Sequence, residues 1–114
     1  MTTRHTARGV RAIEFLESLH GRLTLGRFLR SIREGEEWSL EAMGRRLGIG
    51  PGHLCDVEHG RRTVSPERAA RWARLLGYDE GQMVQLALQA LLDGASLRYS
   101  VSLHRNPRSK RRAA

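Results

Sequence analysis

The stretch from residue 39 to residue 62 constrains the fold more than any other part of the chain. Apolar residues recur in it at the spacing of an amphipathic helix, first over 40–47 and again over 51–58. Glycines and a proline separate the two segments, so neither extends into the other. The apolar residues that can share one small core are Leu40, Met43, Leu47, Ile49, Leu54 and Val57. The pattern predicts two short helices packed together across a tight turn.

The cap residues of this stretch predict where each helix begins and ends. Ser39 is a good N-cap for the first helix, and Gly48 can take the left-handed conformation that ends it. Pro51 suits the first position of the second helix, where its missing N–H is not needed, and Gly60 ends that helix. Gly44 costs about 1 kcal/mol in helix propensity, so we expect the following helix to approach it closely. Two helices joined by a turn of three or four residues form a helix-turn-helix, whose second helix can enter the major groove of DNA.

Caps and apolar periodicity divide the whole chain into three parts. Residues 1–20 hold a polar arm and an amphipathic helix from about 9 to 19, and residues 21–94 hold the helix-turn-helix domain. Residues 95–114 hold a strand and a basic tail. Three further helices of the domain start after Thr24, Ser65 and Asp79 and run to about Glu34, Gly77 and the Asp93-Gly94 stop.

A change of period after the last helix predicts the strand. Leu97, Tyr99, Val101 and Leu103 alternate with polar residues, which is the spacing of a strand with one apolar face. One strand has no partner in an otherwise helical chain, and an open backbone edge recruits other strands. We therefore expect pairing across a dimer or with another protein, the alternative being a strand-like tail packed on the helices. The basic residues of the tail are Arg105, Arg108, Lys110, Arg111 and Arg112. The tail is expected either to be solvated or to contact DNA.

The charge balance favours a polyanionic partner. Of the 114 residues, 20 are Lys or Arg and 12 are Asp or Glu, which gives a formal net charge of +8. A strongly basic small domain points first to nucleic acid and second to an anionic membrane surface. No apolar run approaches the roughly 20 residues that a spanning helix needs, and the N-terminus lacks the apolar core of a signal peptide. We therefore expect a cytoplasmic, nucleoid-associated protein with no membrane partner.

The sequence favours neither catalysis nor metal binding. Cys55 is the single cysteine, so no intrachain disulfide and no multi-cysteine metal site can form. His53 and His59 are six residues apart and do not share a helix face, so they lack metal-ligand spacing. No acid pair and no Ser/His/Asp arrangement emerges. We expect no enzyme, no cofactor and no metal, and we expect Cys55 to be a packing residue rather than a redox sensor.

Residues 25–92 resemble the Cro/C1 (Xre-type) helix-turn-helix family. The resemblance rests on the run from Leu47 to Arg62, with its spacing of a leucine, two residues, an apolar residue, Glu, any residue, Gly and a basic residue. Ser65-Pro66-Glu67 follows at the start of the next helix. The family implies an all-α fold. For this chain we expect a five-helix Cro/C1-type domain with an N-terminal extra helix and a C-terminal β-strand.

A narrower resemblance is to HigA-type antitoxins, the DNA-binding partners of RelE-like toxins. It rests on His53–Asp56 and Val64–Ala70, on the long last helix and strand, and on the N-terminal helix. It implies a repressor of its own operon with a RelE-like toxin as partner. Such toxins tend to be basic, so their contact with this basic chain would need an acidic or apolar surface. The alternatives are a stand-alone phage or host Xre-type regulator without a toxin, and a protein-interaction module on the same scaffold.

The resemblance also implies how DNA is bound. The family forms homodimers that place two recognition helices in successive major-groove segments of an operator, roughly 34 Å apart. Amides at helix N-termini, together with Arg61 and Arg62, would hold phosphates. Arg33 would pair with Glu58 and tie the first helix to the recognition helix. The matching DNA-binding positions are Ser39, Gly50, Pro51, Gly52, His53, Cys55, Asp56, His59, Arg61 and Arg62.

Three of these positions depart from the family's pattern. The family often has Gln, Ser, Lys or Arg where this chain has Pro51, Gly52 and Cys55. Glycine and proline offer no side-chain donor, so few side chains can read base edges directly. His53 can donate to a base or a phosphate, and Asp56 can accept from the N4 amino group of cytosine. We therefore predict a largely electrostatic affinity, with specificity shared among His53, Asp56 and DNA shape.

Overall fold

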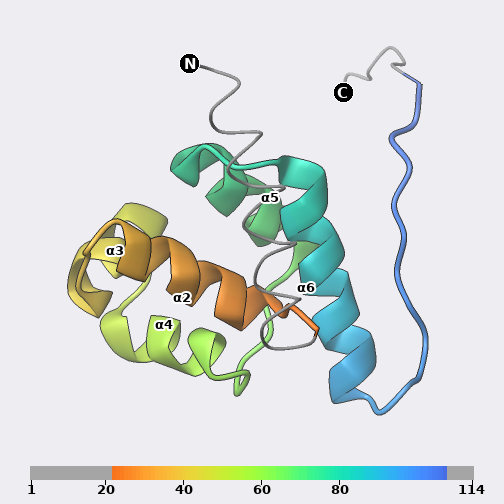
Figure 1. Ribbon diagram of the computed structural model, residues 1–114, viewed down its shortest axis with the longest axis horizontal. Helices are drawn as coiled ribbons and strands as arrows, with labels where there is room; N and C mark the ends of the chain where they lie inside the picture. The colour runs from red at the N-terminus through yellow and green to blue at the C-terminus, as the bar shows by residue number, and fades with distance from the viewer. Residues whose placement is uncertain (1–21, 108–114) are drawn as a thin grey trace.

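Residues 22–107 are described by the computed structural model, and five helices account for most of them (Figure 1). The all-α class predicted from the sequence is therefore confirmed for this part of the chain. The helix expected over 9–19 and the end of the basic tail lie outside the described residues. The helices are α2 (Leu25–Gly35), α3 (Leu40–Leu47), α4 (Pro51–Glu58), α5 (Pro66–Leu76) and α6 (Glu80–Gly94).

Local capping explains where the helices begin and end. Four of the five helices start with a side chain that accepts a hydrogen bond from an amide in the first turn. Gly48 and Gly77 end α3 and α5 in the left-handed conformation, with φ of 79° and 80°. The capping side chains are Thr24, Ser39, Ser65 and Asp79. Each of these N-caps was predicted from the sequence, and the helix bounds agree to within a residue or so.

One apolar core joins the helices. α2 lies between the α3–α4 pair at one end of the domain and α5 and α6 at the other (Figure 1). The indole N–H of Trp72, on α5, donates a hydrogen bond of 3.2 Å to the Leu47 carbonyl at the end of α3. That contact fixes α5 against the helix-turn-helix. The buried core residues are Leu23, Leu25, Phe28, Leu29, Ile32, Met43, Leu47, Leu54, Val57, Val64, Ala69, Trp72, Ala73, Met83 and Ala87.

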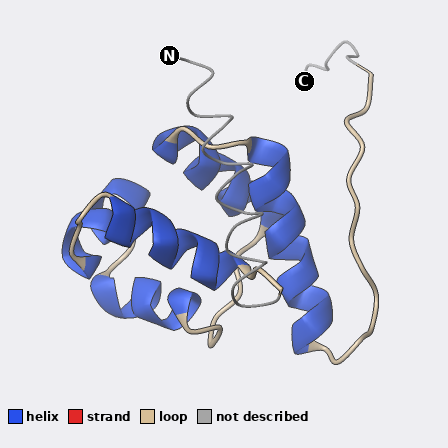
Figure 2. Cartoon of the chain, in the orientation of Figure 1, coloured by secondary structure: helices blue, strands red, loops and turns tan. Residues whose placement is uncertain are grey.

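The C-terminal segment is extended but does not form the predicted strand. Residues 97–107, which we name the C-terminal arm, run back along α6 as a loop, and no strand is assigned within residues 22–107 (Figure 2). The neighbour of the arm is a helix. The side-chain amide of Gln89 on α6 donates to the Tyr99 carbonyl (2.7 Å) and accepts from the Val101 amide (2.8 Å). A side chain thus occupies the place of a partner strand, so no ladder forms, and the strand prediction is wrong for the single chain.

Candidate nucleic-acid interface

The turn between α3 and α4 is tight because two glycines permit it. Gly48 takes the left-handed conformation, and the Ile49 amide donates back to the Gly44 carbonyl at 2.9 Å. A Cβ atom on Gly44 would lie 2.6 Å from the Ile49 carbonyl oxygen. The sequence predicted a close approach at Gly44, but by the following helix. The approaching group is instead the backbone of the turn, which sets the angle at which α4 leaves α3.

The N-terminus of α4 is exposed and has no side-chain cap. Gly50 is the N-cap and provides no capping hydrogen bond, and Pro51 has no N–H to satisfy. The Leu54 amide is bonded to the Gly50 carbonyl at 3.0 Å. The amides of Gly52 and His53 precede it in the first turn, where no intrahelical carbonyl is in reach. They stand at the positive end of the helix dipole, where an anion such as a phosphate is stabilised.

His53 contributes a neutral imidazole to this end of α4. The half-buried side chain has its pKa lowered below 6.5, first by burial and then by the positive charges of Arg62 and Arg68, while Asp56 acts in the opposite direction. At neutral pH the ring is therefore uncharged, and it can accept one hydrogen bond and donate another. Arg68 lies in the first turn of α5 and was not among the predicted site residues. Helical periodicity marks it as surface, but its proximity to His53 arises only from the packing of α5 against α3, which precedes α4.

The C-terminal half of α4 holds a small polar cluster. Arg61 Nε donates to Asp56 at 2.9 Å, and Arg61 Nη2 lies 3.8 Å from the sulfur of Cys55. The hydrogen bond to Asp56 is also the main cause of the raised pKa of Arg61. His59 Nδ1 lies 2.9 Å from the Cys55 carbonyl oxygen and 3.6 Å from its sulfur. Arg62 is exposed and has no ion-pair partner among residues 22–107, so its charge is available to a ligand.

A buried ion pair holds α4 in place. Arg33 on α2 donates two hydrogen bonds to the Glu58 carboxylate, at 2.7 and 3.0 Å, and a third to the Trp38 carbonyl at 3.2 Å. The Glu58 side chain is 1% exposed and that of Arg33 is 17% exposed. The hydrogen bond to Glu58 raises the pKa of Arg33 above its ordinary value. The pair connects α2, the loop before α3 and the end of α4, so it positions the helix.

The structure gathers nine of the ten predicted DNA-binding positions on α4 and the residues beside it. Gly50 through His53 lie at its N-terminus, and Cys55 through Arg62 follow along its second half. Ser39 lies apart, at the N-terminus of α3, where its hydroxyl accepts from the Ala42 amide at 3.0 Å. Exposure separates the set further: His53, Cys55 and Asp56 are half-buried, whereas the remaining seven are exposed.

A short helix with a bare N-terminus, set by a tight turn on a rigid three-helix support, defines a helix-turn-helix DNA-binding domain. Residues 24–86, more than half of the chain, match the family model described as a helix-turn-helix domain, and the protein belongs to that family. This membership supports a DNA-binding role in transcription regulation. No curated protein and no solved structure matches the chain. None of the helices within residues 22–107 is long and apolar enough to cross a membrane.

DNA binding should strengthen as the pH falls, and His53 should carry this dependence. In the free protein the pKa of His53 lies below 6.5, and phosphates beside the ring would raise it because they favour the charged form. Binding then takes up a proton at pH values between the two pKa values, so the affinity rises as the pH falls through that window. Fluorescence anisotropy between about pH 5.5 and 8 measures the effect for the wild type and for His53→Gln, which should lose it.

A melting curve at each pH is the control for this experiment. Because the folded-state pKa of His53 is lowered, the unfolded chain binds more protons, and the fold loses stability as the pH falls from the unfolded value near 6.5 to the lower folded-state value. Protonation of His53 in the free protein therefore does not explain tighter binding by a gain in stability. An undiminished pH dependence in His53→Gln would assign it to another group, with His59 the next to replace.

Proposed function

We propose that the protein is a homodimeric transcriptional repressor that binds operator DNA through α4. The observation that carries the proposal is the exposed, uncapped N-terminus of α4, near which Arg62 and Arg68 lie. Burial is the first cause of the lowered pKa of His53, and the charges of these two arginines lower it further. Helix dipole, free amides and arginine charge all favour a phosphate at this point. Two such sites in a dimer fit two major-groove segments one helical turn apart.

In this proposal the affinity for DNA is mainly electrostatic. The front of α4 presents Pro51 and Gly52, which offer no side-chain donor to a base edge. Asp56 is partly neutralised by Arg61, which binds one of its two carboxylate oxygens and so reduces its repulsion of phosphates. Base readout is therefore left to His53 and the second oxygen of Asp56, and DNA shape supplies the remaining specificity.

Replacing Arg62 with alanine should weaken binding to all DNA sequences and flatten the salt dependence. A lost phosphate contact removes about 0.9 from the slope of log K against log salt. Arg61→Ala should cost less, because Arg61 gives up its hydrogen bond to Asp56 when it turns to DNA. Titrations from about 50 to 200 mM salt measure both slopes, and Arg74→Ala, on the exposed Arg74–Glu80 pair of α5 and α6, is a charge-matched control. An unchanged slope in Arg62→Ala removes Arg62 from the interface.

Footprinting on the DNA upstream of the protein's own gene tests the proposed function as a whole. A repressor should protect a two-fold symmetric site at physiological salt, with a preference of roughly 10³-fold or more over random DNA. Retention of DNA that is equal for all sequences and vanishes at higher salt would contradict the repressor. It would favour the second alternative, a protein-interaction module on the same scaffold.

The narrower proposal is an antitoxin that represses its own operon and binds a RelE-like toxin. Its support is the resemblance of His53–Asp56 and Val64–Ala70 to such regulators, together with an exposed acidic group at the end of α2 formed by Glu34, Glu36 and Glu37. An acidic surface suits a basic toxin. Co-expression with the product of the neighbouring gene, followed by purification of the pair, tests it. A stand-alone regulator would bind its operator and retain no such partner.

A further inference from the structure

The C-terminal arm is held to the domain along one edge only. Gln89 is almost fully buried, at 9% exposure, and its amide is fully used. Its nitrogen donates to the Tyr99 carbonyl at 2.7 Å and to Asp93 at 3.1 Å, while its oxygen accepts from the Val101 amide at 2.8 Å. The Leu97 amide donates to the Leu92 carbonyl at the end of α6 at 2.9 Å. These bonds use the Leu97 N–H, the Tyr99 C=O and the Val101 N–H, so the backbone groups of the odd-numbered residues face α6.

The opposite edge of the arm is open. Successive residues of an extended chain direct their N–H and C=O groups to opposite sides, so those of Arg98, Ser100 and Ser102 face away from α6. Among residues 22–107, the backbone groups of these three residues make no hydrogen bond, and all three residues are exposed. An open edge of this kind is a template for another extended segment.

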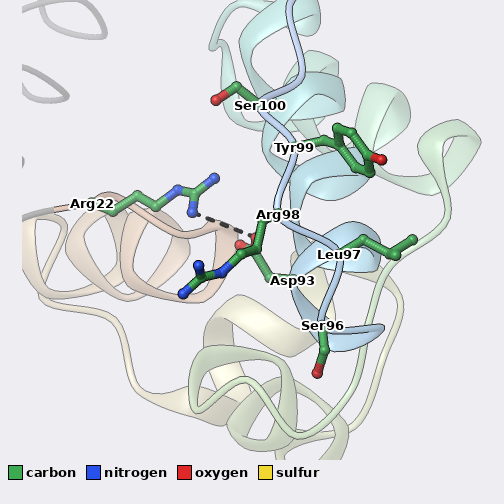
Figure 3. A pocket seen from close by; sticks show the side chains of 7 residues that line it. All are labelled: Arg22, Asp93, Ser96, Leu97, Arg98, Tyr99 and Ser100. Carbon is green, nitrogen blue, oxygen red and sulfur yellow. Dashed lines mark ion pairs between the residues drawn. The ribbon is translucent and has the colours of Figure 1, made fainter.

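The arm also presents an apolar face that the domain leaves exposed. The side chains of Leu97 and Tyr99 lie on one side of the arm, whereas Arg98 and Ser100 lie on the other (Figure 3). Leu97 is 46% and Tyr99 is 67% exposed. Leu103, further along the arm, and Leu91, on the last turns of α6, belong to the same class of exposed large apolar residues. Three of the five such residues in the described part of the chain, Leu97, Tyr99 and Leu103, therefore lie on the arm.

We propose that a second copy of this chain pairs with the arm as an antiparallel strand, about a two-fold axis at Ser100. The register follows from the backbone groups that are still free, because only even-numbered residues can exchange hydrogen bonds across the axis. Ser100 then faces its own copy, and Arg98 faces Ser102 of the second copy. Leu97 meets Leu103 of the second copy and Tyr99 meets its Val101, so the apolar faces coincide.

The two nearest alternative registers are less favourable. With the axis at Tyr99, Ser96 would have to pair with Ser102 of the second copy, but the φ of Ser96 is 60°, so the ladder would be shorter. With the axis at Val101, Arg98 would face His104 of the second copy, and Leu97 would face its Arg105. That arrangement sets a cation beside an imidazole and an apolar residue beside a cation. The register at Ser100 places no charged residue of residues 97–103 opposite another. In this register apolar residues of one arm face apolar residues of the other, so a second copy of the arm matches both the open edge and its exposed apolar face.

This pairing supplies the dimer on which the proposed function depends, yet it can be tested without DNA. Ser100→Pro removes the N–H at the centre of the interface and leaves the bonds of Tyr99 and Val101 to Gln89 in place. Ser100→Ala retains that N–H and is the matched control. Sedimentation equilibrium should show a dimer with a dissociation constant of about micromolar for the wild type and Ser100→Ala, as a small interface gives. Ser100→Pro should weaken it at least about tenfold with little change in melting temperature.

A cysteine pair tests the register directly. In a Cys55→Ser background, Ser100→Cys should form an interchain disulfide under mild oxidation, because residues paired at the axis have Cα atoms about 5.5 Å apart. Ser102→Cys should not cross-link, since its copies would lie about 14 Å apart. Equal cross-linking at both positions, a monomeric wild type, or an intact dimer in Ser100→Pro overturns the proposal. If Ser100→Pro loses the dimer but the wild type binds no operator, the arm interface is supported and the proposed repressor function is contradicted.

Discussion

Gly26→Ala should destabilise the domain by about 3 kcal/mol, the upper range for overpacking a core, and should displace the recognition helix. A Cβ atom at Gly26 would lie 2.4 Å from the Val57 carbonyl oxygen and 2.5 Å from that of Glu58. Both are backbone atoms at the end of α4, so no side chain can turn away to make room. α2 and α4 must separate, and the loss corresponds to a fall of roughly 15 °C in melting temperature for a domain of this size.

Gly35→Ala on the same helix is the control. No atom lies within 4 Å of a Cβ atom at Gly35, and its φ is not among the positive values of the described residues. Alanine there lowers the entropy of the unfolded chain and should raise the stability by about 0.5 kcal/mol. Thermal melting measures the change in stability. Operator binding, measured at a temperature where both variants are folded, reports the placement of α4. Equal melting temperatures for the two variants would show that α2 and α4 are less tightly apposed than the structure indicates.

Elements fixed by local chemistry were predictable from the sequence. Ser39, Ser65 and Asp79 cap helices because their oxygens reach amides three residues along, and that geometry depends on nothing distant. Gly48 ends α3 for an equally local reason, its tolerance of the left-handed conformation. The family resemblance added the three-dimensional relation of α3 to α4, which spacing alone does not supply.

The contacts that set the site between distant segments were not predictable. Nothing in the local sequence marks Gly26 as the point where α2 meets the end of α4, or Trp72 as the donor to the Leu47 carbonyl. Arg68 acts on His53 only because α5 starts near the front of α4. The resemblance named Arg61 and Asp56 as separate DNA contacts, and the structure joins them in one ion pair.

The strand prediction failed for a related reason. Alternation of apolar and polar residues over 97–103 indicates an extended backbone, and the backbone there is extended. It does not specify the neighbour, which decides whether a ladder forms. In a single chain that neighbour is the amide of Gln89, a residue of a helix predicted from its own 3.6-residue period. The extended segment and the helix were therefore each predicted correctly, but the contact between them was not.

Glu58→Ala should destabilise the fold by about 3–5 kcal/mol, the usual effect of removing one partner of a buried ion pair. The Arg33 guanidinium would keep its bond to the Trp38 carbonyl but lose both bonds to the carboxylate, in a site where water reaches little of it. Because the pair connects α2 to the end of α4, the recognition helix should loosen as well. We expect operator affinity to fall at least about tenfold at temperatures below the melting temperature, although the Glu58 side chain is buried in the core.

Glu34→Ala is the matched control. Glu34 pairs with Arg30 on the same helix at 3.0 Å, and both side chains are more than half exposed. Exposed pairs of this kind contribute about 0.3–0.5 kcal/mol, so the two variants should differ roughly tenfold in their effect on the free energy of unfolding. Chemical denaturation measures both values. A joint replacement, Arg33→Met with Glu58→Leu, should recover most of the stability, because the cost in Glu58→Ala comes from an unpaired buried charge. Failure of that joint variant to recover would mean that the geometry of the three hydrogen bonds, rather than the charge pairing, holds α4 against α2.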